Sequence, residues 1–398
     1  MLALDKRLNL DDFADLICSD RFGPAFGRVR KKFVKCMLKG IQRKQSVNLT
    51  EIAKSLDEGI RLHATQKRLS RNLLDPLLCE KLCDRLLRMG AKTVTADTRL
   101  IVHLYTIEKA ERRTSKKDQN VNTRPETGYR VCEIIANDNG LETYTPLLAR
   151  VWSDNSPGFK SDLDEIRKAI HQVLAATQNQ GMLCFDEMSI SVDIMLSLME
   201  DSRLDFLSMI VRGDPEVFYR NELCSVKQLV KDIETPYGQT MFKLVPKGMI
   251  SDTPGDVDIF IHAGTSAVRL PKSNRHLNLI ALKSKQPYLD QEVETPVFTS
   301  RNNLRSRKAL MGIVESLLSI QDVIGTHGAL RQTFDPSNFR VLSYERLKLL
   351  LTLMQGVLYF ETTVTSRVSV KQPKFAAEPH PGELERTYLL PVNGLPEP

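Results

Sequence analysis

Two aspartates stand at the ends of predicted strands. Residues 94–97 predict a strand that ends at Asp97, and residues 182–186 predict one that ends at Asp186. Carboxylates at neighbouring strand ends could hold divalent magnesium, which prefers oxygen ligands in octahedral geometry. Two such ions would activate water and stabilise the leaving oxygen in phosphodiester cleavage. An aspartate after a strand also caps a following helix or begins a turn, so the residues alone leave both interpretations open.

Basic residues are concentrated near the N-terminus. Residues 21–50 contain no Asp or Glu, and their nine cations exceed the net charge of +7 of the whole 398-residue chain. Apolar residues recur at helical spacing from Val29 to Ile41, so the bases occupy the outer face of an amphipathic helix. A solvated face is one interpretation, but the lack of carboxylates favours a polyanionic partner. The cations are Arg21, Arg28, Arg30, Lys31, Lys32, Lys35, Lys39, Arg43 and Lys44.

A second basic helix is predicted shortly afterwards. The cap-like Asn48 precedes an apolar run to Ala53, and the next helix ends at the break formed by residues 74–76. Two short helices followed by a basic one are typical of a helical DNA-binding module, and a helix-turn-helix fits this order. The residues that we expect to contact DNA phosphates are Arg28, Lys31, Lys35, Lys67, Arg68 and Arg71.

Strands and helices alternate in the middle of the chain, which predicts an α/β sheet with carboxylates at its strand ends. The predicted strands are 94–97, 130–136, 182–186 and 206–211, and the predicted helices are 162–176 and 190–199. Residues 111–127 are polar and basic, and we expect them to form a hairpin loop near the ligand.

A β-rich insertion is predicted next, followed by two helices at 308–323 and 344–359 and a Pro-rich, flexible tail. The short strands of the insertion are 241–245, 257–262, 267–270 and 277–282. The predicted domains are a helical DNA-binding domain at 1–90, the first part of the core at 91–216, the insertion at 217–300, the helical C-terminal part of the core at 301–362 and the tail at 363–398.

Composition excludes several classes of protein. With 41% hydrophobic and 26% charged residues, the chain has the apolar material for two or three folded domains. No apolar run is long enough to span a membrane, and the N-terminus is unlike a signal peptide, so we expect a cytoplasmic protein without a membrane partner. Seven scattered cysteines suit reduced thiols better than disulfides. The sequence contains no P-loop, dinucleotide fingerprint or nucleophile elbow.

The order of several short motifs resembles the DDE transposases of bacterial insertion sequences. Asp97-Thr98 resembles the first catalytic block of that family, and Phe185-Asp186, followed by Phe206 and Arg212, resembles the second. The N-terminal part of the match is Leu49-Thr50-Glu51-Ile52-Ala53 and Lys67-Arg68-Leu69-Ser70-Arg71-Asn72-Leu73, and the connector part is Gly128-Tyr129, Pro146-Leu147, Ser153 and Phe159-Lys160-Ser161. The resemblance covers residues 45–360, and it depends on the order in which these short motifs follow one another.

This resemblance implies a ribonuclease-H-like catalytic domain interrupted by the β-rich insertion, behind an all-helical DNA-binding domain. It further implies Mg²⁺ or Mn²⁺ as cofactor, double-stranded DNA as partner, a homodimer on paired DNA ends, and a place in the cytoplasm at the nucleoid. Asp97 and Asp186 would be metal ligands, and Arg212 and Arg331 would join the DNA contacts.

The third catalytic block departs from the family pattern. Alignment of Arg331 with the signature lysine puts Ile324 where the family has its catalytic glutamate. The alternative takes Glu315 as the acid but supplies neither the Tyr nor the Arg that precede it. The second block also differs, since Glu187 follows Asp186 where the family has arginine, and we expect Glu187 in an exposed turn.

Two functions within this family stay open, and a cytosolic α/β protein unrelated to DNA is a third, more remote possibility. One is a magnesium-dependent transposase that cuts element ends and joins them to a target, with Asp97, Asp186 and Glu315 as catalytic residues. The other is a catalytically impaired descendant that acts as a DNA-binding or regulatory protein, because phosphate contacts from basic helices do not need the third acid.

Overall fold

The computed structural model describes residues 8–108, 128–138, 144–201, 203–210, 212–245, 255–285, 292–341 and 343–365. These residues divide into unit 1, which runs to Gly181 and resumes at Thr326, and unit 2, from Met182 to Gly325. The loop predicted at 111–127, and the predicted tail after residue 365, lie outside the described residues.

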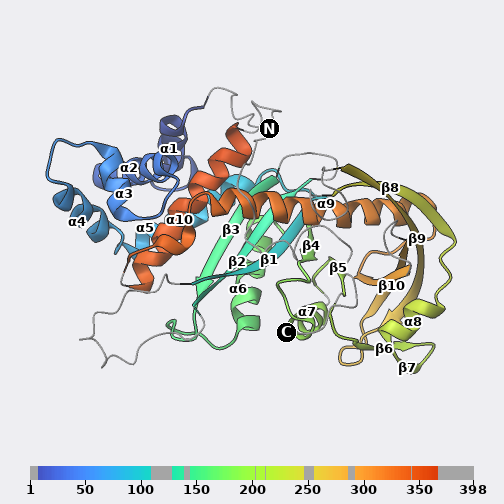
Figure 1. Ribbon diagram of the computed structural model, residues 1–398. Coiled ribbons are helices and arrows are strands. Elements are labelled where there is room, and N and C mark those ends of the chain that lie inside the picture. The colour runs from blue at the N-terminus through green and yellow to red at the C-terminus, as the bar shows by residue number, and fades with distance from the viewer. Residues whose placement is uncertain are drawn as a thin grey trace, which may run out of the picture. The chain divides into compact units, whose positions relative to one another are not determined.

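Unit 1 joins a group of helices to a three-stranded antiparallel sheet (Figure 1). Its helices are α1 (Leu10–Cys18), α2 (Arg28–Lys44), α3 (Leu49–Leu56), α4 (Leu62–Asn72), α5 (Pro76–Ala91), α6 (Asp162–Ala176) and α10 (Tyr344–Phe360), together with the end of α9 (Arg307–Gln332). Its strands are β1 (Arg99–Ile107), β2 (Tyr129–Asn137) and β3 (Tyr144–Trp152), and β2 pairs with both neighbours. Single helical turns occupy Asp20–Phe22, Pro336–Asn338 and Glu361–Thr365.

Helix α10 lies in the hydrophobic core of unit 1. Nearly every residue from Leu347 to Phe360 is buried, and the helix packs against α2, α5 and β3 (Figure 1). The ring of Phe13 on α1 lies 5.8 Å from that of Tyr359. Gly356 permits this packing, because a Cβ there would lie 3.2 Å from a methyl of Leu38 on α2. An apolar helix is thus the support on which the basic N-terminal helices are held.

The buried Arg85 on α5 fixes the segment between α1 and α2. Its guanidinium donates to the carbonyl oxygens of Ile17 at 2.6 Å, Ser19 at 2.8 Å, Gly23 at 3.1 Å and Pro24 at 2.5 Å. Burial lowers the pKa of this guanidinium, and the four carbonyls replace water around its charge. Arg85 therefore sets where α2 begins.

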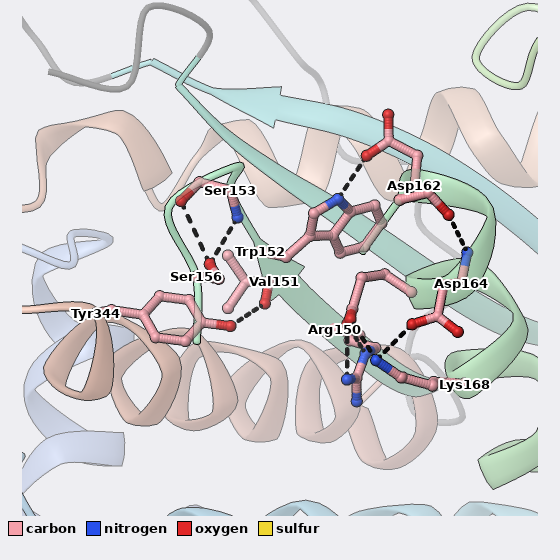
Figure 2. Close-up of polar contacts among 11 residues, drawn as sticks. Arg150, Val151, Trp152, Ser153, Ser156, Asp162, Asp164, Lys168 and Tyr344 are labelled. Carbon is pink, nitrogen blue, oxygen red and sulfur yellow. Dashed lines mark hydrogen bonds and ion pairs between the residues drawn. The ribbon is translucent and has the colours of Figure 1, made fainter. Parts of the chain in front are cut away.

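The end of β3 and the start of α6 are joined by polar contacts (Figure 2). The indole Nε1 of Trp152 donates to Asp162 at 2.8 Å, and the hydroxyl of Tyr344 donates to the carbonyl of Val151 at 2.6 Å. Ser161 caps α6 by accepting from the Asp164 amide at 3.1 Å. This segment resembles the transposase connector, which lies between the first two catalytic blocks. Its described contacts hold β3, α6 and Tyr344 together.

Unit 2 is a mixed sheet with short helices. Its strand order is β4-β5-β11-β10-β9-β6-β7, with β8 on β9; β4 and β5 are parallel, and the other pairs are antiparallel. The strands are β4 (Met182–Phe185), β5 (Phe206–Met209), β6 (Glu216–Tyr219), β7 (Glu222–Ser225), β8 (Tyr237–Val245), β9 (Gly255–Arg269), β10 (His276–Lys285) and β11 (Glu292–Thr299). The helices are α7 (Val192–Met199), α8 (Val226–Asp232) and the N-terminal part of α9.

Helix α9 is the one described helix that is long and apolar enough to cross a membrane by length and composition. The core helix of a soluble protein satisfies the same test, and α9 has many buried residues, among them Leu310, Val314 and Leu317.

The mixture of helices and sheet agrees with the predicted α/β class. The helix predicted at 162–176 and the strand predicted at 182–186 are confirmed by α6 and β4. The strand predicted at 94–97 is wrong, because these residues form turns and the strand begins at Arg99. The strands predicted at 257–262 and 267–270 are parts of the single strand β9.

Candidate nucleic-acid interface

A basic groove runs along α2 in unit 1. Apart from the adjacent Lys31 and Lys32, its cations follow at intervals of three or four residues and therefore lie on one side of the helix, while Phe33, Met37 and Ile41 are buried on the other. The groove has a volume of about 450 Å³ and continues to Leu56, the last residue of α3, and to Glu58 in the turn that follows. The cationic residues that line it are Arg28, Lys31, Lys32, Lys35, Lys39 and Arg43.

Helix α1 supplies carboxylates that the basic segment itself lacks. The Nζ atoms of Lys31 and Lys35 lie 3.0 and 2.6 Å from Oδ1 of Asp15, and Nζ of Lys39 lies 2.7 Å from Oδ2 of Asp11. The hydrogen bond from Lys35 lowers the pKa of Asp15, and the same bond raises the pKa of Lys35. Lys31 and Lys35, both predicted DNA contacts, are thus already partly neutralised within the protein.

Other cations of this face lie outside these ion pairs. Arg28 and Lys32 are exposed, and neither has an ion-pair partner among the described residues. Among the described residues, Arg43 donates to the carbonyl of Ser55, at 3.4 Å. Since a phosphate can replace water around such side chains without first breaking an ion pair, Arg28 and Lys32 are better placed to bind an anion than the paired lysines of α2.

Helices α3 and α4 follow one another across a short turn and pack together, and their role as a helix-turn-helix stays a prediction. Asn48 caps α3 by accepting from the Thr50 amide at 3.0 Å, and the chain turns through Asp57 and Gly59, whose φ angles are +42° and +67°. In α4, only Thr65 and Leu69 are buried. The exposed residues His63, Lys67 and Arg71 follow at intervals of four, so they share its outer face.

Arg68 differs from its neighbours on α4. Its Nη2 lies 2.5 Å from Oε2 of Glu58, and this hydrogen bond lowers the pKa of Glu58. Similarly, Arg30 of α2 binds both oxygens of Asp75, at 2.6 and 3.1 Å, and Asp75 caps α5. Arg68 was predicted to contact phosphate, but its described contact holds α4 against the turn before it.

Asp97 is exposed in the turn before β1 in unit 1 rather than at a strand end. The next residue, Thr98, is buried, and its hydroxyl donates to Asp138 at 2.5 Å. The predicted position of Asp97 at the end of a strand is therefore corrected, since the local pattern of residues 94–97 belongs to consecutive turns.

Asp186 follows β4 in unit 2, as predicted, and is buried. Its Oδ1 accepts from the amide of Met188 at 3.2 Å, which is the turn-forming role of an aspartate. Glu187 is only 5% exposed, so the expectation of an exposed turn is wrong. Its Oε1 accepts from Nε2 of Gln321 at 3.0 Å, and burial, together with the charge of Asp186, raises the pKa of Glu187 to about 8.

Glu315 is exposed on α9, and its described contact is with Gln239 of β8, whose Nε2 lies 3.4 Å from Oε1. Ile324, at the aligned position of the family's glutamate, is partly buried. In the parts of both units that the structure describes, no three His, Cys, Asp or Glu side chains form a group that could hold a metal ion. Asp97 lies in unit 1 and Asp186 and Glu315 lie in unit 2, and their role as ligands of Mg²⁺ or Mn²⁺ stays a prediction.

Arg331 is buried in unit 1, which corrects its prediction as a DNA contact. Its Nη1 lies 2.6 Å from Oε2 of Glu133, and its guanidinium lies 3.6 Å from the ring centre of Tyr105. His327, one turn earlier, places Nε2 3.2 Å from the same Oε2. The charge of Arg331 lowers the pKa of Glu133 against the opposing effect of burial. Arg212, by contrast, is exposed in a bend after β5.

The buried cluster of Glu133, His327 and Arg331 was not predicted from the sequence. A glutamate within the apolar strand Val131 to Ala136, and His327 four residues before Arg331, are the signals that could have indicated it.

No family model matches this sequence, and no curated protein matches it. Among solved structures, the chain is similar to a piggyBac transposase in a cryo-EM structure of its synaptic complex with hairpin DNA. The two sequences are 11% identical, the match covers 91% of this chain and 73% of that chain, and the TM-score is 0.42.

Proposed function

We propose that this chain is a transposase-type DNA-binding protein that contacts double-stranded DNA through α2 and α4. The observation that carries the proposal is the basic face of α2, where exposed Arg28 and Lys32 lie in one groove with four more cations. Cations spaced along one helix face match the regular negative charge of a duplex backbone. Lys67 and Arg71 on the outer face of α4 would add contacts, because the second helix of a helix-turn-helix enters the major groove.

The binding experiment measures retardation of labelled duplex DNA by the full chain. We expect Arg28→Glu/Lys32→Glu to weaken retardation by at least roughly tenfold, because two attractive charges become repulsive. The matched control is Lys92→Glu/Lys160→Glu, which makes the same charge change at two exposed lysines of unit 1 outside the groove. Equal weakening in both double variants would contradict the proposal.

We further propose that the chain is a catalytically impaired member of the transposase type, bound to DNA as a homodimer in the cytoplasm. The supporting observation is that two acids of unit 2 are engaged within the protein, since Glu315 accepts from Gln239 and Glu187 accepts from Gln321.

The catalytic test incubates duplex DNA and Mg²⁺ or Mn²⁺ with the wild type and with Asp97→Asn. We expect both proteins to retard the DNA equally and neither to cut it. Metal-dependent cleavage by the wild type that is lost in Asp97→Asn would instead support the working transposase.

A further inference from the structure

The groove on α2 has an acidic and apolar side opposite its cations. Besides the six cations of α2, the groove is lined by Cys36, Leu56 and Glu58. Helices α3 and α4 pack against α2, and the turn between them carries Glu58 (Figure 1). Among the described residues that line the groove, Glu58 is the only acid. Its carboxylate would repel a bare phosphate chain, so the groove suits a ligand that also carries hydrogen-bond donors.

Glu58 is an ionised acceptor. The hydrogen bond from Arg68 lowers the pKa of Glu58, and the charge of Lys32 lowers it further. Nη2 of Arg68 donates to Oε1 at 2.7 Å and to Oε2 at 2.5 Å, and the hydroxyl of Thr65 donates to Oε2 at 3.2 Å. Because a carboxylate has about four acceptor positions, Oε1 has room for a further donor from a ligand.

Cys36 forms a neutral floor between this carboxylate and the cations. Burial raises the pKa of its thiol and the charge of Glu58 raises it further, so the thiol keeps its proton at neutral pH. The charges of Lys32 and Lys39 also act on this thiol. The acid and the two lysines therefore lie around one uncharged part of the groove.

The groups follow a fixed order along the groove. Glu58 lies near Lys32, whose charge acts on it, while Arg43 donates to the carbonyl of the residue before Leu56 at 3.4 Å. The groove therefore presents cations first, then Glu58, and then Leu56 with Arg43. The distance from Lys32 to Arg43 is roughly 16 Å along the helix axis, at about 1.5 Å per residue.

We propose that this groove binds a free ribonucleoside triphosphate. Its phosphates would lie on Arg28 and Lys32, and its ribose 2′ hydroxyl would donate to Glu58, since an acid beside a phosphate site commonly accepts from this hydroxyl. Its base would lie between Leu56 and Arg43, because a guanidinium stacks on planar rings. The volume of about 450 Å³ falls within the range of about 300–1,000 Å³ for small-molecule sites.

The test is isothermal titration calorimetry of the full chain with ATP in a buffer without divalent cations. We expect Arg28→Ala/Lys32→Ala to bind ATP roughly tenfold more weakly, because charge-assisted contacts to the phosphates are lost. The matched control is Lys92→Ala/Lys160→Ala, which removes two exposed lysines of unit 1 outside the groove and should bind ATP like the wild type.

The ratio of the affinities for ATP and dATP tests Glu58, because dATP lacks the 2′ hydroxyl. We expect the wild type to prefer ATP by at least roughly fivefold and Glu58→Ala to lose this preference. Glu58→Gln keeps an acceptor for Arg68 and should show a smaller preference than the wild type. Glu51→Ala removes a partly exposed acid of α3 outside the groove and should keep the preference. Circular dichroism checks that the variants fold.

Three results would overturn the proposal. They are equal affinities of the wild type for ATP and dATP, equal affinities for ATP and inorganic tripolyphosphate, and unchanged ATP binding in Arg28→Ala/Lys32→Ala. An oligouridine that binds through the same residues more tightly than ATP would assign the groove to an RNA strand and would also overturn it.

Competition with DNA separates this proposal from the proposed function. If α2 contacts duplex DNA, ATP should displace a labelled duplex, and this competition rests on the proposed function, whereas ATP binding itself does not. ATP binding without displacement of the duplex would support the nucleotide site and contradict the DNA contact of α2. Duplex binding that depends on Arg28 and Lys32, without ATP binding, would do the reverse.

Discussion

The Nζ atom of Lys35 on α2 lies 2.6 Å from Oδ1 of Asp15 on α1, and the same oxygen lies 3.0 Å from Nζ of Lys31. One carboxylate thus holds two of the cations that line the groove. A phosphate that binds Lys35 must displace Asp15 or share the lysine with it, so α1 weakens the attraction of α2 for anions.

Asp15→Asn should therefore strengthen duplex binding. It releases two lysines and removes a negative charge near the phosphates, so we expect the dissociation constant to fall roughly threefold or more at low salt. The measurement is anisotropy of a labelled duplex. Asp20→Asn serves as control because Asp20 is exposed and has no ion pair among the described residues. An unchanged dissociation constant in Asp15→Asn would show that this ion pair does not compete with DNA.

Arg331→Met should destabilise unit 1 strongly. It leaves Glu133 buried without its main cation, and loss of one partner of a buried pair typically costs about 3–5 kcal/mol. Glu133→Gln/Arg331→Met should recover much of that loss, because no unpaired charge remains. Urea unfolding followed by circular dichroism gives both free energies. A double variant as unstable as the single one would contradict a role for the ion pair.

Glu187 should make stability depend on pH. Its pKa is raised from 4.5 to about 8 in the folded protein, so the folded state holds a proton that the unfolded state releases. The contribution of Glu187 to the free energy of unfolding should be highest below about pH 4.5 and should decrease as the pH rises to about 8.

Glu187→Gln keeps the acceptor for Gln321 but does not titrate. The decrease in stability between these pH values should therefore be smaller in Glu187→Gln than in the wild type, measured by urea unfolding at several pH values. Identical pH profiles of the two proteins would mean that Glu187 titrates normally.

Local patterns predicted those elements whose apolar faces are continuous. The helix at α2 follows from Phe33, Met37 and Ile41, which recur at helical spacing on its buried face, and α6 follows from a similar pattern in residues 162–176. The apolar run before Asp186 likewise predicted β4. The strand predicted at residues 94–97 was wrong because the alternation of Val94 with Thr95 resembles the pattern of a strand, while the chain forms turns before Arg99.

The site was predictable only in part, because charge pairing is a tertiary property. The lack of Asp and Glu in residues 21–50 indicated the basic face of α2. No feature of these residues reveals that Asp11 and Asp15 lie against that face. Arg331 resembled a phosphate contact by its position in a motif, whereas its burial depends on Glu133 far away in the sequence.

The most direct measurement is the salt dependence of duplex binding by the wild type and by Arg28→Ala/Lys32→Ala. If both cations bind phosphates, the variant should bind roughly tenfold more weakly near physiological salt, and the slope of log affinity against log salt should decrease by about two, since each contact contributes about 0.9. An affinity and a slope equal to those of the wild type would contradict the central claim that the exposed cations of α2 contact DNA.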